Sequence, residues 1–133
     1  MNLRRISHEL KNTSWVMNEE EKQIIVNDRT VFVLPSMYPF KCPTLLIDNH
    51  SHVDVLKKRL LTYVDFCKVC HIQLPCICCR SITASWSPCY TCKDIYKEFL
   101  FFKKMIHDLY VLSQLYEKNI PDIIIKEISS YLL

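Results

Sequence analysis

Apolar residues recur at helical spacing at the very start of the chain. Leu3, Ile6 and Leu10 lie three and four residues apart, and charged residues fill the positions between them. Because an α-helix repeats every 3.6 residues, this spacing predicts an N-terminal helix over residues 1–12 with one apolar face.

The pattern then changes to short runs that are typical of strands. Gln23–Val26 and Thr30–Leu34 are rich in β-branched and apolar residues, and a proline follows the second run. Thr44–Ile47 is a further run of the same kind. Short runs of this type, bounded by turn residues, predict an antiparallel strand meander over residues 13–47.

Helical spacing returns in the second half of the chain. It predicts an inserted helix over residues 52–66 and long C-terminal helices over residues 93–133, the last of them beginning at Pro121. Residues 67–92 show no period and are expected to form a loop. The order of these elements predicts one α+β domain spanning residues 1–133.

Composition narrows the class of protein. Half of the 133 residues are hydrophobic and 23% are charged, which is typical of a globular domain. The net charge of +3 is spread along the chain and not clustered, which argues against nucleic-acid binding. Without an apolar run of membrane-spanning length or a signal-like start, we expect no membrane association and an intracellular, cytoplasmic location.

The chain contains no glycine. Its turns must therefore use residues such as Asn18, Asn27, Asp48, Asn49 and Asn119, since Asn and Asp tolerate left-handed backbone better than other residues. Ile, Lys, Asn, Tyr and Phe are plentiful, which favours an AT-rich genome. A large DNA virus is one source that fits, and the location would then be the host cytoplasm.

Seven of the eight cysteines lie between residues 67 and 92. With no secretory signal, this clustering indicates metal or thiol chemistry before disulfides. Cys67, Cys70, Cys89 and Cys92 form two C-x-x-C pairs at the spacing of a tetrahedral zinc site, so they are our leading set of ligands for a structural zinc ion. The C-x-x-C pair formed by Cys76 and Cys79 competes with the first of these pairs.

Two further motifs carry a resemblance to a known family. Ile77-Cys78 precedes Trp86-Ser87-Pro88, with Trp86 eight residues after the cysteine, and Tyr38-Pro39-Phe40-Lys41-Cys42-Pro43 forms a proline-rich turn upstream. In this order and spacing the motifs resemble those of ubiquitin-conjugating (E2) enzymes and their non-catalytic relatives, the RWD domains. The opening Leu3–Leu10 also resembles the first helix of that family, which implies an E2-like fold with a cis bond before Pro39.

The resemblance implies that Cys78 accepts ubiquitin as a thioester. The chemistry needs a thiolate nucleophile and a donor that holds the developing oxyanion. The family's His-Pro-Asn triplet is missing, and the nearest substitute for its amide is Gln73. Arg80 stands where the family has an aspartate. Alternatively, Cys78 is a zinc ligand or a buried thiol of the core.

The resemblance also implies partners. In E2 enzymes the loops that correspond to Phe40, Lys41, Ser87 and Pro88 contact RING and HECT ligases, and Arg4 and Arg5 are expected nearby. The implied partners are ubiquitin or a ubiquitin-like protein, its activating enzyme and such a ligase. Trp86 is expected only to fold its loop.

Three interpretations of function remain open. The chain is a divergent conjugating enzyme, a catalytically silent variant that binds ubiquitin or a ligase, or a zinc-stabilised interaction module without ubiquitin chemistry. Residues 120–132 resemble the first helix of an F-box, which recruits an adaptor. Because any amphipathic helix begun by Pro-Asp has this pattern, we favour the simpler interpretation of a terminal helix.

Overall fold

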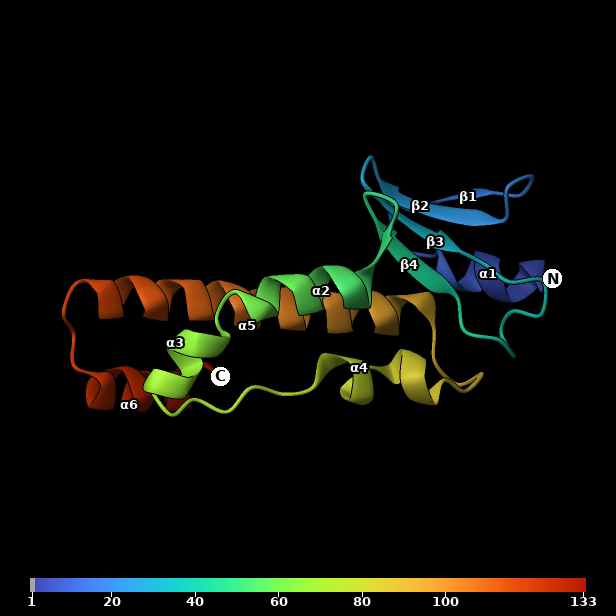
Figure 1. Cartoon of the computed structure of the whole chain (residues 1–133). Coiled ribbons are helices and arrows are strands. Elements are labelled where there is room, and N and C mark those ends of the chain that lie inside the picture. The colour runs from blue at the N-terminus through green and yellow to red at the C-terminus, as the bar shows by residue number, and fades with distance from the viewer. Residues whose placement is uncertain (1) are drawn as a thin grey trace.

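An antiparallel sheet stands at one end of the molecule, and long helices extend away from it (Figure 1). The computed structural model describes residues 2–133. The α+β class and the antiparallel meander that the sequence predicts are both confirmed.

The five strands pair in the order in which they occur in the chain, and one face of the sheet is apolar. Ile24 pairs with Phe32 and Phe32 pairs with Leu45, so three buried side chains lie in a row across the sheet. Such cross-strand rows stabilise a sheet because neighbouring side chains bury one another. The strands are β1 (Val16–Asn18), β2 (Gln23–Asn27), β3 (Thr30–Val33), β4 (Thr44–Ile47) and β5 (His50–Ser51).

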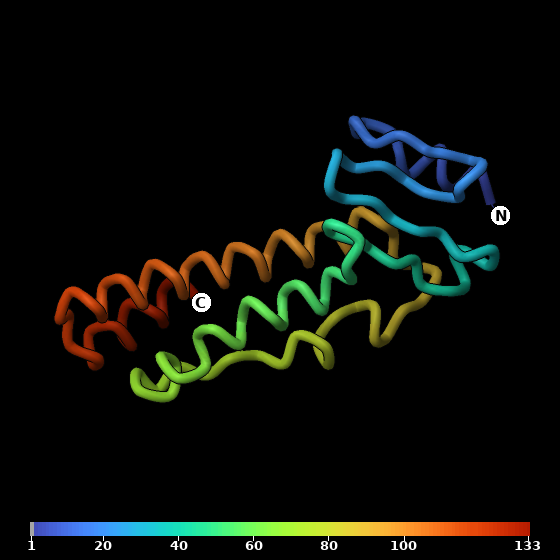
Figure 2. Tube along the Cα trace, turned by 45° about the horizontal axis from the view of Figure 1, so that its top comes forward, coloured from blue at the N-terminus to red at the C-terminus, as the bar shows by residue number. Residues whose placement is uncertain are grey.

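Helices make up most of the remaining chain. They are α1 (Leu3–Glu9), α2 (His52–Leu61), α3 (Val64–Val69), α4 (Ile77–Arg80), the 3-10 helix η1 (Ile82–Ser85), α5 (Cys92–Glu117) and α6 (Asp122–Leu132). Helix α2 lies alongside α5, and α6 folds back against the distal end of α5 (Figure 2).

The structure differs from the sequence prediction at two helix boundaries and within residues 67–92, where the expected loop contains the short helices α4 and η1. The predicted inserted helix is two helices, because Tyr63, between the end of α2 and the start of α3, has φ of −108° and ψ of 4°, which departs from helical geometry. The first helix stops at Glu9, and Asn12 beyond it has a left-handed backbone with φ of 61°, which cannot continue a right-handed helix.

The left-handed positions use some of the residues expected to replace glycine, whereas Asn18 and Asn27 are the last residues of β1 and β2 and are not among them. Asp48 and Asn49, between β4 and β5, and Asn119, before α6, all have positive φ. Lys22 and His71 share this geometry, which the sequence did not indicate. The peptide bond between Tyr38 and Pro39 is cis.

The main core joins the apolar face of the sheet to α1, α2 and α5. A second, smaller cluster lies farther along α5, where Cys70 packs with Leu112 and Ile125. The cysteine-rich segment after α3 runs back along the helices toward the sheet (Figure 1). It therefore links the distal end of the helical layer to the start of α5.

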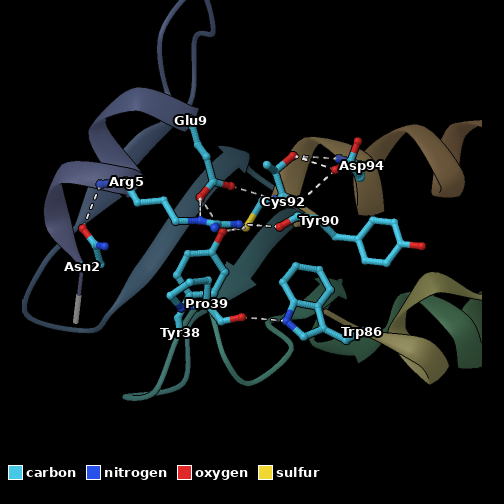
Figure 3. A network of polar contacts seen from close by, with 10 residues as sticks. Asn2, Arg5, Glu9, Tyr38, Pro39, Trp86, Tyr90, Cys92 and Asp94 are labelled. Atoms are coloured by element: carbon cyan, nitrogen blue, oxygen red, sulfur yellow. Dashed lines mark hydrogen bonds and ion pairs between the residues drawn. The ribbon is translucent and has the colours of Figure 1, made fainter. Parts of the chain in front are cut away.

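A buried carboxylate holds the sheet end of the molecule together (Figure 3). Glu9 is only 7% exposed, and it accepts hydrogen bonds from the Tyr38 hydroxyl at 2.5 Å, from Arg5 Nε at 3.2 Å and from the Cys92 backbone N–H at 3.0 Å. Arg5 Nη2 also donates to the Tyr90 carbonyl at 2.5 Å. The network fixes α1, the turn at Tyr38 and the start of α5 relative to one another.

Replacing Glu9 with glutamine should destabilise the fold. The amide presents a donor to groups that themselves donate, and the charge that strengthens these hydrogen bonds is lost. We expect Glu9→Gln to lower the free energy of unfolding by about 2–3 kcal/mol in urea denaturation. Glu19→Gln, at an exposed carboxylate beyond β1, is the matched control and should leave the midpoint unchanged; equal midpoints for both variants would contradict the role of Glu9.

Candidate functional site

Three exposed cysteines gather on the short helix α4. Cys76 is the N-cap residue of α4, and Cys78 and Cys79 lie within its single turn. Ile77 between them is buried in the main core. One apolar side chain thus anchors the turn, and the three thiols remain on the outside.

The three sulfur atoms lie close together. Cys76 Sγ is 3.1 Å from Cys78 Sγ and 3.2 Å from Cys79 Sγ, and the remaining pair is 3.9 Å apart. Within residues 2–133 this trio is the group of His, Cys, Asp or Glu side chains whose geometry could hold a metal ion. We call Cys76, Cys78 and Cys79 the thiol cluster.

Hydrogen bonding within the thiol cluster shifts the pKa values of Cys76 and Cys79 in opposite directions. Contacts with the Cys78 thiol first, and then with the Cys79 thiol, lower the pKa of Cys76 to about 7. The hydrogen bond to Cys76 is the main cause that raises the pKa of Cys79 to about 11. At neutral pH a substantial fraction of Cys76 is therefore thiolate, the form that acts as nucleophile and metal ligand.

Two anchors position the segment that follows the thiol cluster. Glu98 on α5 accepts hydrogen bonds from Ser81 Oγ and from the Ile82 backbone N–H, both at 2.8 Å. Farther along, Trp86 Nε1 donates to the Pro39 carbonyl at 2.8 Å (Figure 3). The segment is thereby fixed to α5 at one point and to the proline-rich turn at another, and the expectation that Trp86 folds its loop is confirmed.

A buried histidine lies behind the first anchor. His52 is 3% exposed, and its Nε2 atom lies 3.6 Å from Glu98 Oε2 without a hydrogen-bond partner among the described residues. Burial lowers the pKa of His52, while the charge of Glu98 opposes that shift. The neutral His52 imidazole therefore packs beside the Glu98 carboxylate, which already accepts hydrogen bonds from Ser81 and Ile82.

The predicted catalytic residues both lie near α4. Cys78 is exposed, so the alternative that it is a buried core thiol is wrong. Gln73 is exposed in the preceding loop, and with Arg80 it lines an open groove of about 540 Å³. Phe101, Phe102 and Met105 of α5 provide the apolar wall of this groove.

The residues predicted to contact a ligase lie on neighbouring segments. Phe40 is 72% exposed on the proline-rich turn, and Lys41 beside it is exposed as well. The Trp86 hydrogen bond draws Ser87 and Pro88 to this turn. Arg5 is tied to the same loop through the Tyr90 carbonyl, whereas Arg4 is exposed on α1.

The predicted zinc quartet is not brought together. Cys70 packs against Leu112 near the distal end of α5, whereas Cys92 begins that helix. Twenty residues of α-helix span about 30 Å, so these two cysteines cannot share one ion. Cys67 is buried in the core and Cys89 is exposed beside Ser87. Sequence spacing alone could not reveal that a long helix separates the two pairs.

Sequence reasoning therefore undervalued Cys76 and Cys79 and missed Glu98. The C-x-C-C spacing at residues 76–79 was visible, and it was the signal that could have favoured the thiol cluster. Glu98 gave no signal, because its partners lie sixteen and seventeen residues earlier in the chain.

Comparisons with family models, curated proteins and solved structures found no match for this chain. Among residues 2–133, no helix combines the length and the apolar character needed to cross a membrane.

Removing the Glu98 carboxylate should loosen the thiol cluster's attachment. In Glu98→Ala the Ile82 amide loses its acceptor, so we expect its hydrogen exchange to accelerate at least about 10-fold, the equivalent of about 1.4 kcal/mol of local protection. Amide exchange followed by mass spectrometry measures this change. Glu117→Ala, at an exposed carboxylate of the same helix, should leave the exchange of residues 76–85 unaltered; the anchor would be refuted if both variants behaved alike.

Proposed function

We propose that this protein is a divergent member of the ubiquitin-conjugating type that accepts an acyl group as a thioester on Cys78. The observation that carries this proposal is the hydrogen bond from Trp86 to the Pro39 carbonyl. It joins the two sequence motifs on which the resemblance rests, although they lie far apart in the chain. The exposed Cys78 thiol sits on the segment that this contact helps to position.

The thiol cluster offers a way to activate Cys78. Cys76 Sγ lies 3.1 Å from Cys78 Sγ, and its lowered pKa makes it a base near neutral pH. Cys76 would take the Cys78 proton as the Cys78 sulfur attacks the thioester carbonyl of ubiquitin carried by its activating enzyme. The new carbon–sulfur bond forms at Cys78, and the enzyme's thiolate leaves.

The surroundings suggest where partners would contact the protein. Gln73 and Arg80 line the groove beside α4 and supply donors that could face a developing oxyanion. The exposed Phe40 and Lys41, together with Ser87, Pro88 and the arginines of α1, would form the ligase-facing surface. A ubiquitin or ubiquitin-like protein, its activating enzyme and a RING or HECT ligase are the partners in this proposal.

A thioester assay tests the proposal directly. Incubation with activating enzyme, ATP and ubiquitin should yield an adduct that reducing agent cleaves. Cys78→Ser should convert it into an adduct that resists reductant, because a hydroxyl acceptor leaves an oxyester. Gln73→Ala should keep loading intact and slow transfer to lysine by about 10²-fold if its amide holds the oxyanion.

The controls separate Cys78 from its neighbours. Cys42→Ser and Cys79→Ser should retain the thioester, and Cys76→Ser should form it more slowly. A reductant-cleavable adduct that persists in Cys78→Ser would assign the acceptor to another cysteine. A folded protein that forms no adduct would exclude acyl transfer and favour the silent, ubiquitin- or ligase-binding variant.

A second candidate function is a zinc-stabilised interaction module, and the spacing of the thiol cluster favours it. Tetrahedral zinc with Zn–S bonds of about 2.3 Å places its sulfur ligands about 3.8 Å apart. The sulfur separations of 3.1, 3.2 and 3.9 Å approach this value, and small side-chain rotations would complete the fit. Cys76, Cys78 and Cys79 would supply three ligands and leave a fourth position for water or a partner's side chain.

Metal analysis tests this candidate. Protein purified under reducing conditions should carry about one zinc ion per chain, and a chelator should increase amide exchange in residues 76–85. Cys79→Ser should lower the zinc content. Cys89→Ser, at an exposed cysteine outside the thiol cluster, should leave it unchanged. Reduced protein without metal, and with the cluster thiols freely titratable, would rule this candidate out.

A further inference from the structure

Cys79 has no part in the proposed acyl transfer, yet its thiol lies 3.2 Å from that of Cys76. Both side chains are exposed, and the two residues form a C-x-x-C pair. The pair is thus accessible to small molecules and already close to bonding distance.

The local backbone accounts for this closeness. Cys76 is the N-cap of α4 and has an extended backbone with φ of −80° and ψ of 107°. A side chain at the N-cap reaches over the first turn toward the third helical residue, which here is Cys79. A disulfide has an S–S bond of about 2.05 Å, so the two sulfur atoms need to approach by only about 1.2 Å.

The pairing with Cys79 is better suited to a covalent bond than the pairing with Cys78. Cys78 Sγ is as close to Cys76 Sγ, at 3.1 Å, but a C-x-C disulfide closes a smaller and more strained ring, whereas C-x-x-C is the spacing of reversible dithiol pairs. Cys76 is also the central sulfur of the cluster, since both other thiols lie within hydrogen-bond distance of it, at 3.1 and 3.2 Å. Its thiolate is therefore placed to attack first, and Cys79 is placed to resolve the mixed disulfide.

We propose that Cys76 and Cys79 form a dithiol site that exchanges with low-molecular-weight disulfides such as glutathione disulfide. The Cys76 thiolate attacks one sulfur of the small disulfide, which forms a mixed disulfide and releases one thiolate. Cys79 then loses its proton and attacks the Cys76 sulfur, which forms the Cys76–Cys79 disulfide and releases the second thiolate. Starting from the Cys76 thiolate and the Cys79 thiol, the protein loses one proton and two electrons, and the small disulfide is reduced to two thiolates that take up protons from water.

This inference is independent of acyl transfer, because it requires neither ubiquitin nor an activating enzyme. In the disulfide form Cys78 is the one free thiol of the cluster, so Cys76 can no longer serve as a base and the trio can no longer hold a metal ion. The redox state of the pair would therefore determine which chemistry the cluster performs.

Equilibration with glutathione redox buffers tests the inference. The full-length, chelator-treated protein is incubated in buffers of increasing glutathione disulfide content, quenched with N-ethylmaleimide and digested with trypsin. Cleavage after Lys68 and Arg80 releases residues 69–80, which contain Cys70 and the whole thiol cluster. We expect oxidation to remove two of the four alkylations on this peptide, and fragmentation should assign the loss to Cys76 and Cys79.

Single variants identify the partners. Cys78→Ser should retain the disulfide, and so should Cys89→Ser at an exposed cysteine outside the cluster. Cys76→Ser should form none. Cys79→Ser should accumulate a glutathionyl group on Cys76, since Cys78, at the strained C-x-C spacing, is not expected to resolve the mixed disulfide. Circular dichroism should show every variant folded. Full alkylation of the oxidised wild-type peptide would overturn the proposal, as would a protein disulfide at Cys76 that persists in Cys79→Ser.

Discussion

The hydrogen bonds accepted by the buried Glu9 carboxylate fix how the helices and the sheet end of the molecule are placed relative to one another. A buried carboxylate is costly to desolvate, and it is tolerated only because hydrogen-bond donors surround it. Its three donors come from α1, from the turn at Tyr38 and from the first residue of α5. The N–H of Cys92 lies in the first turn of α5 and has no partner within the helix, so Glu9 satisfies it. The start of the longest helix is thereby fixed against the sheet end of the molecule.

The thiol cluster takes its position from elements that this carboxylate has already fixed. Glu98 belongs to α5, and the Pro39 carbonyl belongs to the turn that Tyr38 anchors. The segment between them is therefore constrained at two points without a regular element of its own beyond α4 and η1. The thiols themselves are exposed, and the contacts that their sulfur atoms make are with one another. The frame thus fixes the backbone of the site and leaves the sulfur atoms accessible to reagents.

Local pattern predicted the elements well, and it failed where distant residues decide the outcome. The apolar stripes predicted α5 and α6, and the short apolar runs predicted β2 to β4. Each of these elements buries one face, so its apolar residues recur at the period of the element and over its whole length. The break between α2 and α3 was not predicted, because the apolar spacing continues across it while the backbone at Tyr63 leaves helical geometry. The partners of Glu9 and Glu98 could not be predicted either, since they depend on how α1 and η1 meet α5. The zinc quartet was wrongly predicted for the same reason. The spacing of its two C-x-x-C pairs matched a zinc site, but Cys70 and Cys92 lie far apart along α5.

The chemistry of the thiol cluster is limited by competition for the same sulfur atoms. A thioester occupies Cys78, a metal ion requires three deprotonated thiols, and a disulfide consumes Cys76 and Cys79. The disulfide and the metal ion exclude each other outright, because each requires Cys76 and Cys79. The disulfide leaves the Cys78 thiol free, but it consumes Cys76, the proposed base for Cys78. The proposed acyl transfer would therefore need the trio to be reduced and free of metal. The low pKa of Cys76 would favour each of the three proposed chemistries, and it follows from crowding three thiols onto one turn of helix.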